Sequence, residues 1–560
     1  MWLPVLLTLP SARAVDLFSS WRYFSTPLPI PEVIDMTSGG SLQMVMGRSD
    51  QHSWGAGLTA NGSIFGYARL GNQPTFPGPT ILTAVGVPIE VTWLNNLSAP
   101  HVLDFAISTT LLQNYANSSC YPGCGVAAIV HLHGGQSPAI YDGEGKYEFT
   151  YGQSKVDQYL NRNLPGTLMY HDHAMGFLRL NNYAGMAGSY IIQNKTFDAA
   201  NNLSLSCDIP MVLQDKTIQS NGQIYYFTNQ NENFNCANNP RADHWVPDQF
   251  GRVDTINGVV SPYLNVPKSK CRFRIINTAN SRDYTIQFPF YRKCTVIAMD
   301  ATYVSTPWKL TSSGLFLAEF QRAEIICDFS TFAVGKQFNV TTSQSPKFED
   351  TNSSNPYFMQ IRVVSSSGGS SSGVIPSTLT NFKDFVSLYS QTNGANRYIL
   401  YRQVDATGCV AAAFTIYYGT AGFNGPLVNA NISTNVVIPC VKGTVEHWVI
   451  ENQSGYTHPF HWHATGAMCS TTDGSPDTTT FWNVMEVTAG QTMYCYVACM
   501  PSESLVVGSS VSSTDFGFST DEPYVSHCHR LEHGDNLMTV MCVFTIPGTM
   551  YKDEIRRISS

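Results

Sequence analysis

One short stretch near the C-terminus carries side chains that together could bind a redox-active metal. It reads His527-Cys528-His529-Arg530-Leu531-Glu532-His533, and Met538 follows five residues later. A thiolate, two imidazoles and a more distant thioether form the ligand set of a blue-copper site. His533 and Met538 lie close enough to Cys528 in the chain to share one ion with it. The stretch therefore predicts a centre that accepts electrons one at a time.

The two histidines that flank Cys528 have a different geometry. In an extended segment successive side chains point to opposite faces, so His527 and His529 point away from the face that Cys528 occupies. We expect them to bind a second metal centre while they remain covalently joined to the first. Such a connection would carry electrons from one centre to something that is reduced at the other.

Three other windows repeat a His-x-His pattern. With the Cys528 stretch they span 19 residues and contain ten of the 14 histidines, where a random spread would place about half a histidine. A single His-x-His pair is more often a structural pair on a strand, so the argument rests on all four windows together. The three windows are His131-Leu132-His133, His171-Asp172-His173 and His458-Pro459-Phe460-His461-Trp462-His463.

These four windows resemble the copper-binding motifs of the multicopper oxidases, and the surrounding sequence is most similar to the branch of laccases, spore-coat laccases and bilirubin oxidases. The resemblance covers nearly the whole chain and is weakest between about residues 464 and 521. It implies an enzyme that oxidises phenolic, aromatic amine or tetrapyrrole donors and reduces O₂ to water. Three further stretches support it: Pro74–Thr80, Gly166–Met175 and Cys271–Asn277.

The resemblance implies a role for each ligand and a total of four copper ions. Cys528 and His533 would carry electrons from the donor, and the edge of the His533 ring would face that donor. The type 1 copper would be bound by His458, Cys528, His533 and Met538, the type 2 copper by His131 and His461, and the paired type 3 coppers by His133, His171, His173, His463, His527 and His529.

Reduction of O₂ consumes protons, so an acid near the cluster is expected. Asp142 stands where related laccases carry an aspartate near the type 2 copper, although Asp142-Gly143 could equally be only a turn. The relatives place a glutamate directly after the equivalent of His533, whereas this chain has Gly534, with Asp535 next to it. Asp172, between two ligands, is expected to support them, and Asp300 is a further candidate for a metal-ion or proton-shuttle role.

Length and composition exclude several other classes of protein. At 560 residues the chain is too long for one hydrophobic core and predicts three domains. Only 13% of residues are charged, the net charge is -8, and runs of Lys or Arg are absent, which argues against nucleic-acid binding. No segment has 18 consecutive apolar residues, so we expect no transmembrane span.

The N-terminus and the cysteines predict a secreted protein. Residues 1–14 contain a short apolar run that ends in an Ala-x-Ala pattern, typical of a signal peptide, although a basic segment is missing. With Cys528 assigned to copper, 13 cysteines remain, so disulfides are expected, with at least one cysteine unpaired; Cys120 and Cys124 could form a local pair. We also expect glycosylation at some of nine sequons: Asn61, Asn96, Asn117, Asn194, Asn202, Asn339, Asn352, Asn431 and Asn452.

The segments between the windows read as short strands and turns, with little helical periodicity. Examples are the alternating stretch Val87–Trp93 and the buried stretch Gly188–Ile192. We predict an all-β protein of three cupredoxin-like Greek-key β-sandwich domains, at residues 15–195, 205–364 and 374–547, with a Ser/Gly linker at 365–373. The middle domain has one histidine and no ligand motif, so it is expected to act as a spacer.

Two alternatives to a laccase-like oxidase stay open. The first is a ferroxidase or other metal-ion oxidase on the same scaffold, which a carboxylate cluster beside His533 would favour. The second is a copper protein that only transfers electrons, which the complete set of eight histidines for the second centre argues against. The expected partners are O₂ and a small reducing substrate, and we expect a monomer.

Overall fold

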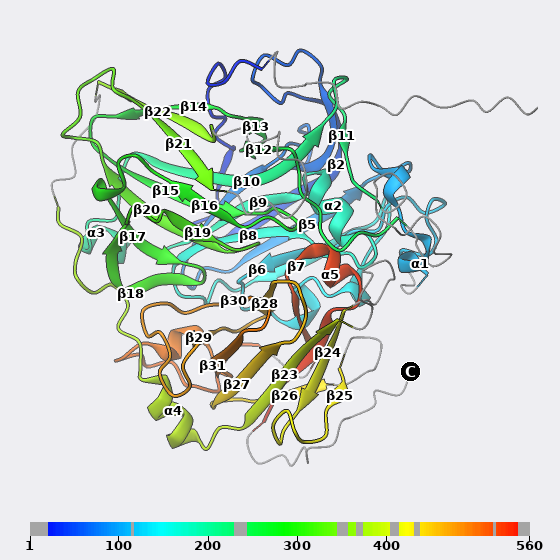
Figure 1. The fold of residues 1–560 in the computed structure, drawn as a ribbon, viewed down its shortest axis with the longest axis vertical. Coiled ribbons are helices and arrows are strands. Elements are labelled where there is room, and N and C mark those ends of the chain that lie inside the picture. Colours follow the sequence, from blue (N-terminus) through cyan, green and yellow to red (C-terminus); the bar gives the residue numbers. More distant parts are fainter. Residues whose placement is uncertain are drawn as a thin grey trace, which may run out of the picture.

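The computed structural model describes residues 21–113, 117–228, 244–343, 357–365, 373–403, 414–430, 437–518 and 522–546. These ranges form six β-sheets with a few short helices (Figure 1). The expected signal peptide and most of the Ser/Gly linker lie outside the described residues. Each third of the chain contributes two of these sheets, which are described below as the first, second and third pair of sheets. The prediction of an all-β fold is confirmed. The sheet pairs fall within the three predicted ranges, whose exact limits remain predictions.

The first pair of sheets has strand orders β1-β4-β9-β8-β6 and β3-β2-β5-β7. β1 pairs with β4 and β2 with β5 in parallel, so the chain crosses between the sheets instead of running back as simple hairpins. The strands are β1 Val33–Asp35, β2 Gly40–His52, β3 Gly62–Arg69, β4 Gly78–Ala84, β5 Ile89–Asn96, β6 Val130–His133, β7 Ser154–Tyr159, β8 Gly166–Asp172 and β9 Ala187–Gln193.

The second pair has orders β13-β12-β10-β15-β20-β17-β18, with β11 on β10, and β14-β22-β21-β16-β19. Its strands are β10 Asp208–Ile218, β11 Ile224–Tyr225, β12 Val253–Ile256, β13 Val259–Val260, β14 Tyr263–Pro267, β15 Lys270–Asn277, β16 Tyr284–Gln287, β17 Cys294–Met299, β18 Thr302–Lys309, β19 Leu315–Leu317, β20 Arg322–Asp328, β21 Gln337–Ser343 and β22 Met359–Val364.

The third pair has orders β25-β24-β23-β27-β31-β29 and β26-β33-β32-β28-β30. Its strands are β23 Asn396–Gln403, β24 Phe414–Gly419, β25 Val428–Asn429, β26 Val437–Val441, β27 Val445–Asn452, β28 His458–Trp462, β29 Ala467–Ser470, β30 Val484–Val487, β31 Thr492–Ala498, β32 Tyr524–Cys528 and β33 Thr539–Thr545.

Burial along the strands follows their place in the layers. β5 alternates between buried and half-buried residues, as the sequence predicted, because one face packs on the core and the other approaches solvent. β8, β28 and β32 are buried along their whole length, since the first and third pairs of sheets meet there. These are the strands that carry most of the histidine windows.

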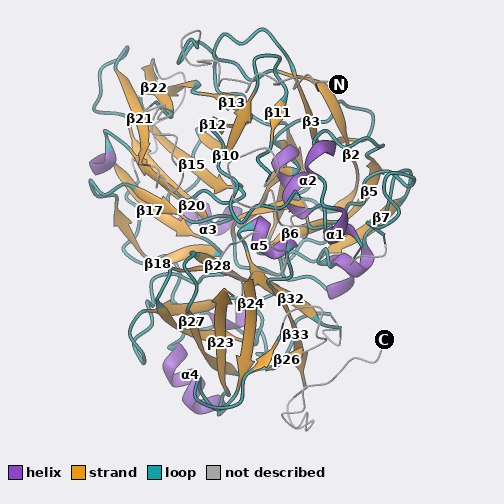
Figure 2. Ribbon diagram, turned by 45° about the vertical axis from the view of Figure 1, so that its right-hand side comes forward, coloured by secondary structure: helices purple, strands orange, loops and turns teal. Residues whose placement is uncertain are grey.

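The helices are short and lie at the edges of the sheets or at their junctions (Figure 2). α2 packs against α5 where the first and third parts of the chain meet, and α5 also contacts β32. No helix of the described residues has the length and apolar character needed to cross a membrane. The α-helices are α1 Thr109–Leu112, α2 Leu178–Ala184, α3 Lys195–Ala200, α4 Phe385–Thr392 and α5 Leu531–Asp535; the 3-10 turns are Asp104–Ala106, Ala139–Tyr141, Gly145–Tyr147, Tyr291–Lys293 and Ser502–Leu505.

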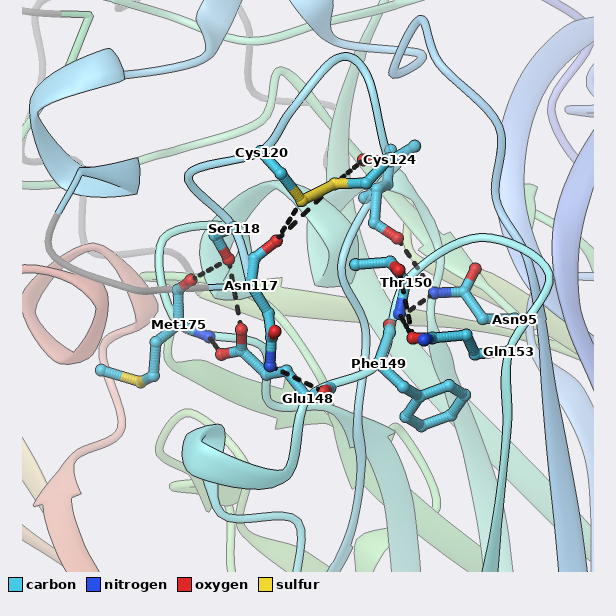
Figure 3. The surroundings of a disulfide bond; sticks show 12 residues. Asn95, Asn117, Ser118, Cys120, Cys124, Glu148, Phe149, Thr150, Gln153 and Met175 are labelled. Atoms are coloured by element: carbon cyan, nitrogen blue, oxygen red, sulfur yellow. Dashed lines mark hydrogen bonds between the residues drawn. A yellow bond between two sulfur atoms is a disulfide. The ribbon is translucent and has the colours of Figure 1, made fainter.

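The expected local disulfide between Cys120 and Cys124 is confirmed. Figure 3 shows how the bridged loop is tied to its surroundings. Ser118 Oγ donates to the carbonyl oxygen of Met175 at 2.8 Å, and the Glu148 carboxylate accepts the Met175 N–H at 2.6 Å. Because Met175 lies two residues after the second His-x-His window, this loop supports a candidate ligand segment.

Four further disulfides join strands or their ends within the second and third pairs of sheets. Among the described residues two cysteines are unpaired, Cys528 and Cys542, and both are buried. Cys236 and Cys409 lie outside the described residues. The disulfides are Cys207–Cys271, Cys294–Cys327, Cys440–Cys499 and Cys469–Cys495.

Candidate functional site

The four histidine windows come together in the interior between the first and third pairs of sheets. His131 lies opposite His171 in the β6–β8 ladder, and His461 lies opposite His527 in the β28–β32 ladder. Each ladder thus presents a cross-strand pair of imidazoles, and the two pairs face each other. All ten window histidines are buried: His131, His133, His171, His173, His458, His461, His463, His527, His529 and His533.

Eight of these histidines form one continuous cluster. The Nε2 atoms of His131 and His461 are 3.3 Å apart, although 330 residues separate them in the chain. Potential ligand atoms also lie within 4.8 Å of one another in three triplets, which are His131/His133/His461, His133/His171/His529 and His173/His463/His527. All three triplets draw one or two members from each side of the junction, so neither part of the chain could build them alone.

The protonation of these imidazoles shows that the cluster needs a cation. His131 donates from Nδ1 to the Asp142 carbonyl oxygen at 2.6 Å, and His461 donates from Nδ1 to the Asn483 carbonyl oxygen at 2.7 Å. In a neutral imidazole whose Nδ1 carries the proton, Nε2 is a bare lone pair. The 3.3 Å contact between the two Nε2 atoms therefore joins two lone pairs, which repel each other unless a metal ion lies between them.

A second contact of this kind lies in the His173/His463/His527 triplet. His463 donates to Asp142 Oδ2 at 2.7 Å and His527 to the Cys528 carbonyl oxygen at 3.0 Å, while their Nε2 atoms are 3.1 Å apart. Two ligands at about 2.0 Å from a tetrahedral ion are roughly 3.3 Å from each other. The spacings therefore fit imidazoles that share a metal ion of the first transition row.

Burial keeps the imidazoles in the form that binds metals. Removal from water lowers the pKa of His171 to about 3 and that of His527 to about 4, and it lowers the pKa of His131 and His463 well below the usual value. Neighbouring imidazoles add to this effect, because two protonated rings would repel each other. At neutral pH these side chains are therefore uncharged and offer lone pairs.

A separate group surrounds Cys528. Its Sγ lies 3.4 Å from Nδ1 of His458 and 3.6 Å from Nδ1 of His533, and the two Nδ1 atoms are 3.1 Å apart. Met538 is fully buried in the same core cluster, and its carbonyl oxygen accepts the Cys528 N–H at 3.0 Å. One thiol and two imidazoles thus converge, with a methionine beside them. Burial raises the pKa of the Cys528 thiol, and a bound cation would reverse this effect by stabilising the thiolate.

The two groups are joined through one residue. His527 and His529 belong to the eight-histidine cluster, while Cys528 between them belongs to the other group. His527 and Cys528 are the last two residues of β32, so their side chains point to opposite faces, as expected for an extended segment. His529 follows directly after the strand. A metal ion in one group would be linked to an ion in the other through a few covalent bonds.

Asp142 contacts the histidine cluster directly. Its Oδ2 accepts from His463, its carbonyl oxygen accepts from His131, and its Oδ1 has no hydrogen-bond partner within the described part of the chain. Burial, together with the nearby carboxylates of Glu144 and Asp157, raises its pKa well above the usual range. The turn interpretation also holds, because Gly143 adopts φ +82° and a Cβ there would lie 2.6 Å from the His131 Cα atom.

Gly534 and its neighbour Asp535 have different surroundings in the structure. A Cβ at Gly534 would lie 3.6 Å from His527 Nδ1, so a longer side chain at this position would enter the space beside the cluster. Asp535 points elsewhere: its carboxylate pairs with Arg179 at 2.9 Å and accepts the Gly176 N–H at 2.5 Å. Asp535 is therefore held in an ion pair and does not take the place of the missing side chain.

Asp172, which lies between two ligand candidates, is held in place by several hydrogen bonds. Its carboxylate accepts from the N–H groups of Ile129 and Ala174 and from the amide of Asn181, at 2.9–3.1 Å. This agrees with a supporting role. Two histidines outside the windows have hydrogen-bond partners of their own: His52 bonds to the Gly258 carbonyl oxygen, and His101 to Asn181.

The second pair of sheets reaches the cluster, although the sequence predicted only a spacer there. The ring of Phe320 stacks on His529 with centroids 3.9 Å apart and contacts His171 edge-on at 4.8 Å. Arg322 bonds to Asn483, whose carbonyl oxygen holds His461. No histidine or cysteine marks this segment, so the motif search missed it. The structure also brings Arg322 close to Gly134, directly after a ligand candidate, where a Cβ would lie 2.7 Å from Arg322 Nη2.

Comparisons with known proteins agree with this geometry. A family profile described as "Multicopper oxidase" matches residues 413–546. The chain is 29% identical over 526 residues to the multicopper oxidase LPR1 homolog 1 of Oryza sativa subsp. japonica, covering 85% of this chain and 84% of the relative. It is 28% identical over 491 residues to a laccase of Bacillus subtilis (strain 168), covering 84% and 88%.

Solved structures show the same fold. The McoA multicopper oxidase of Aquifex aeolicus aligns with a TM-score of 0.67 at 20% identity, covering 93% of this chain and 99% of that one. A laccase of Pediococcus acidilactici aligns with a TM-score of 0.67 at 18% identity, covering 93% of each chain. The predicted cupredoxin-like architecture is thereby confirmed.

Proposed function

Since this chain belongs to the multicopper oxidase family, we propose that it is a laccase-like oxidase that couples one-electron oxidation of a donor to four-electron reduction of O₂ to water. The observation that carries the proposal is the pair of metal-binding groups joined through Cys528, in which imidazole lone pairs 3.1–3.3 Å apart require cations between them. A binding protein would not need two such groups linked by a single residue.

The donor sets fit copper and support the predicted ligand roles. His458, Cys528 and His533, with Met538 beside them, would hold a type 1 copper. The triplets His133/His171/His529 and His173/His463/His527 would each hold one type 3 copper, and His131 with His461 would hold the type 2 copper. When bound, copper supplies one-electron chemistry at the Cys528 group and reduction of O₂ at the eight-histidine cluster.

The protein residues position the ligands and control protons. Backbone carbonyl oxygens of Asp142, Asn483 and Cys528 accept from imidazole Nδ1 atoms and fix which nitrogen stays free. Ser454 Oγ, 2.7 Å from His458 Nε2, orients that ring in the Cys528 group. Asp142 can hold a proton at Oδ1 beside the cluster, since its other carboxylate oxygen is engaged with His463.

An organic donor is favoured over Fe(II) by the carboxylates nearest Cys528. Asp248 and Glu319 both interact with the Cys528 thiol through space, and such acids could bind Fe(II) if they were accessible. Both are buried and pair with Arg530, at 2.6 Å and 3.1 Å. Exchange of these ion pairs for a hydrated metal ion would leave a buried guanidinium without its partners, which is costly. We therefore propose a phenolic, aromatic amine or tetrapyrrole donor, with a ferroxidase as the alternative.

The proposal is tested with one copper-loaded preparation. Elemental analysis should give four copper ions per chain, and O₂ uptake should be faster with a phenol or bilirubin than with Fe(II). A single copper ion per chain would point to an electron-transfer protein instead. Uptake that is fastest with Fe(II) would support the ferroxidase.

Secretion is part of the proposal and is supported by the five disulfides of the described residues, which form in oxidising compartments. The sequons are not equivalent. Asn452 is fully buried, and its side chain donates to the Tyr456 and Val487 carbonyl oxygens, so it is not available for glycosylation.

Met538 should tune the reduction potential of the Cys528 group. If its thioether is a weak axial ligand, Met538→Leu keeps the blue colour and raises the type 1 potential, because loss of a soft donor destabilises Cu(II) more than Cu(I). A tenfold change in the ratio of the two oxidation states corresponds to about 59 mV, and we expect a rise of that order. Redox titration of the blue band measures it. An unchanged potential in a fully loaded variant would remove Met538 from the ligand set.

A further inference from the structure

The segment Phe320–Arg322 projects from the second pair of sheets into the eight-histidine cluster. Phe320 is fully buried and adopts φ +63°, a conformation that bulky side chains rarely occupy. Asp300, which pairs with Arg322, also has a positive φ of +51°. Such strained residues persist only where their surroundings impose them, and they gather at functional sites. The strain here places one ring and one charge against the cluster.

Arg322 is held from three sides. Nη1 donates to Asp300 Oδ1 at 2.6 Å and to Asn483 Oδ1 at 2.8 Å, and Nε donates to the Thr167 carbonyl oxygen at 3.3 Å. Thr167 belongs to the first part of the chain and Asn483 to the third, so the guanidinium spans the junction. Nη2 is buried and has no hydrogen-bond partner within the described residues.

The guanidinium of Arg322 lies beside two of the ligand candidates. Asn483, which accepts from Arg322, also accepts from His461 through its carbonyl oxygen, and a Cβ on Gly134, the residue after His133, would lie 2.7 Å from Arg322 Nη2. Asp300 keeps its negative charge on the side of Asn483 and Val484, whose N–H groups stabilise it by donating to Oδ2 at 2.5 Å and 2.7 Å. Burial lowers the pKa of Arg322, but guanidinium keeps its proton at any pH at which the protein is folded.

We propose that Arg322 is an electrostatic positioning residue that raises the reduction potential of the metal ions bound by the eight-histidine cluster. This inference rests on the proposed copper site. The eight ligands are neutral imidazoles, so a fixed positive charge in a low-dielectric interior disfavours the more highly charged Cu(II) relative to Cu(I). The higher potential helps electrons to move from the Cys528 group to the cluster. The middle part of the chain thus contributes to catalysis without a ligand of its own.

The test compares variants that keep or remove the charge. In Arg322→Lys the charge stays, whereas in Arg322→Gln it is lost while a hydrogen-bond donor toward Asp300 remains. The electron paramagnetic resonance signal of the type 2 Cu(II) is followed through a redox titration of the copper-loaded enzyme, and the blue band serves as an internal reference. We expect Arg322→Gln to reduce the ratio of Cu(I) to Cu(II) about tenfold at a fixed ambient potential, which corresponds to about 59 mV. Arg322→Lys should shift it by much less.

A matched control separates charge from structure. Arg282 is a buried arginine of the same part of the chain, and it pairs with Asp215 at 2.7 Å away from the histidine cluster. Arg282→Gln removes a comparable ion pair and should leave the type 2 titration unchanged. Double substitution of Arg322→Gln with Asp300→Asn removes both charges and should still lower the potential, since the guanidinium is the group that approaches Gly134 beside His133.

The outcomes are distinguishable. Copper-loaded Arg322→Gln with a wild-type type 2 titration would overturn the inference, as would an equal shift in Arg322→Lys or in the blue band. If Arg322→Gln, Arg322→Lys and the double variant all failed to bind copper, the arginine would have only a structural role. A wild-type protein without a type 2 signal would instead overturn the proposed copper site.

Discussion

Replacement of Cys528 by serine is expected to abolish both the blue colour and donor oxidation while the eight-histidine cluster keeps its copper. The blue absorption requires a thiolate bound to Cu(II), and a serine hydroxyl is a poor ligand there. Cys528 is also the residue through which the two groups are joined, so its loss interrupts the path for electrons. Donor oxidation should fall to the background rate.

The measurements are absorption spectroscopy, copper analysis and O₂ uptake on the same sample. The chain offers a matched control in Cys542, the other buried free cysteine of the described residues, whose Sγ lies 3.5 Å from Ser526 Oγ. Cys542→Ser should keep the colour, the copper and the activity. If Cys528→Ser still oxidised the donor at the wild-type rate, electrons would have to enter at the cluster directly, and the proposed role of the Cys528 group would be wrong.

Replacement of Asp142 by asparagine is expected to slow reoxidation of the reduced enzyme by O₂ by about 10²–10⁴-fold, the usual contribution of a general acid. Asparagine can still accept from His463 through Oδ1, so the ligand stays oriented. It cannot deliver a proton. Reduction of the Cys528 group by the donor should be nearly unchanged, because Asp142 contacts only the cluster histidines His131 and His463 there.

The pH dependence of this step has a defined sign. Burial raises the pKa of Asp142, so the carboxyl keeps its proton to a higher pH than an ordinary aspartate, and it loses that proton as the pH rises through its own pKa. Wild-type reoxidation should therefore slow as the pH rises, and the asparagine variant should lack this dependence. Bound cations would move the transition to lower pH without a change of sign.

Stopped-flow spectroscopy separates the two half-reactions. Asp157→Asn is the control, since Asp157 is a buried carboxylate near Asp142 that pairs with Lys155 instead of a histidine. It should keep the reoxidation rate at low pH and only move the pH transition downward, because the Asp157 charge helps to raise the pKa of Asp142. A wild-type reoxidation rate in Asp142→Asn at all pH values would leave Asp142 as a turn residue. Glu144, which is largely buried and paired with Lys146 near the surface, would then be the next candidate.

The sequence by itself determined the class of the fold and the composition of the two groups. The period of a β-strand is two, so a His-x-His pair places both rings on one face, and Cys528 between His527 and His529 must face the other way. These are local relations that survive whatever the strands pack against. The faces of these side chains were therefore readable before any contact was known, as was the short-range pairing of Cys120 with Cys124, whereas the division of the histidines among copper ions followed from the resemblance to multicopper oxidases.

Tertiary structure alone decided which distant groups meet. Sequence gave equal weight to two interpretations of Asp142, whereas packing places its carboxylate on His463, 321 residues away. Asp535, a neighbour of Gly534, points to Arg179 because α2 packs on α5. Phe320 and Arg322 reach the cluster from a segment in which Phe320 has a positive φ, and no residue type in the sequence indicates this conformation. The physical reason is that a strand's faces follow from its own residues, whereas contacts between sheets depend on how distant parts of the chain pack against one another.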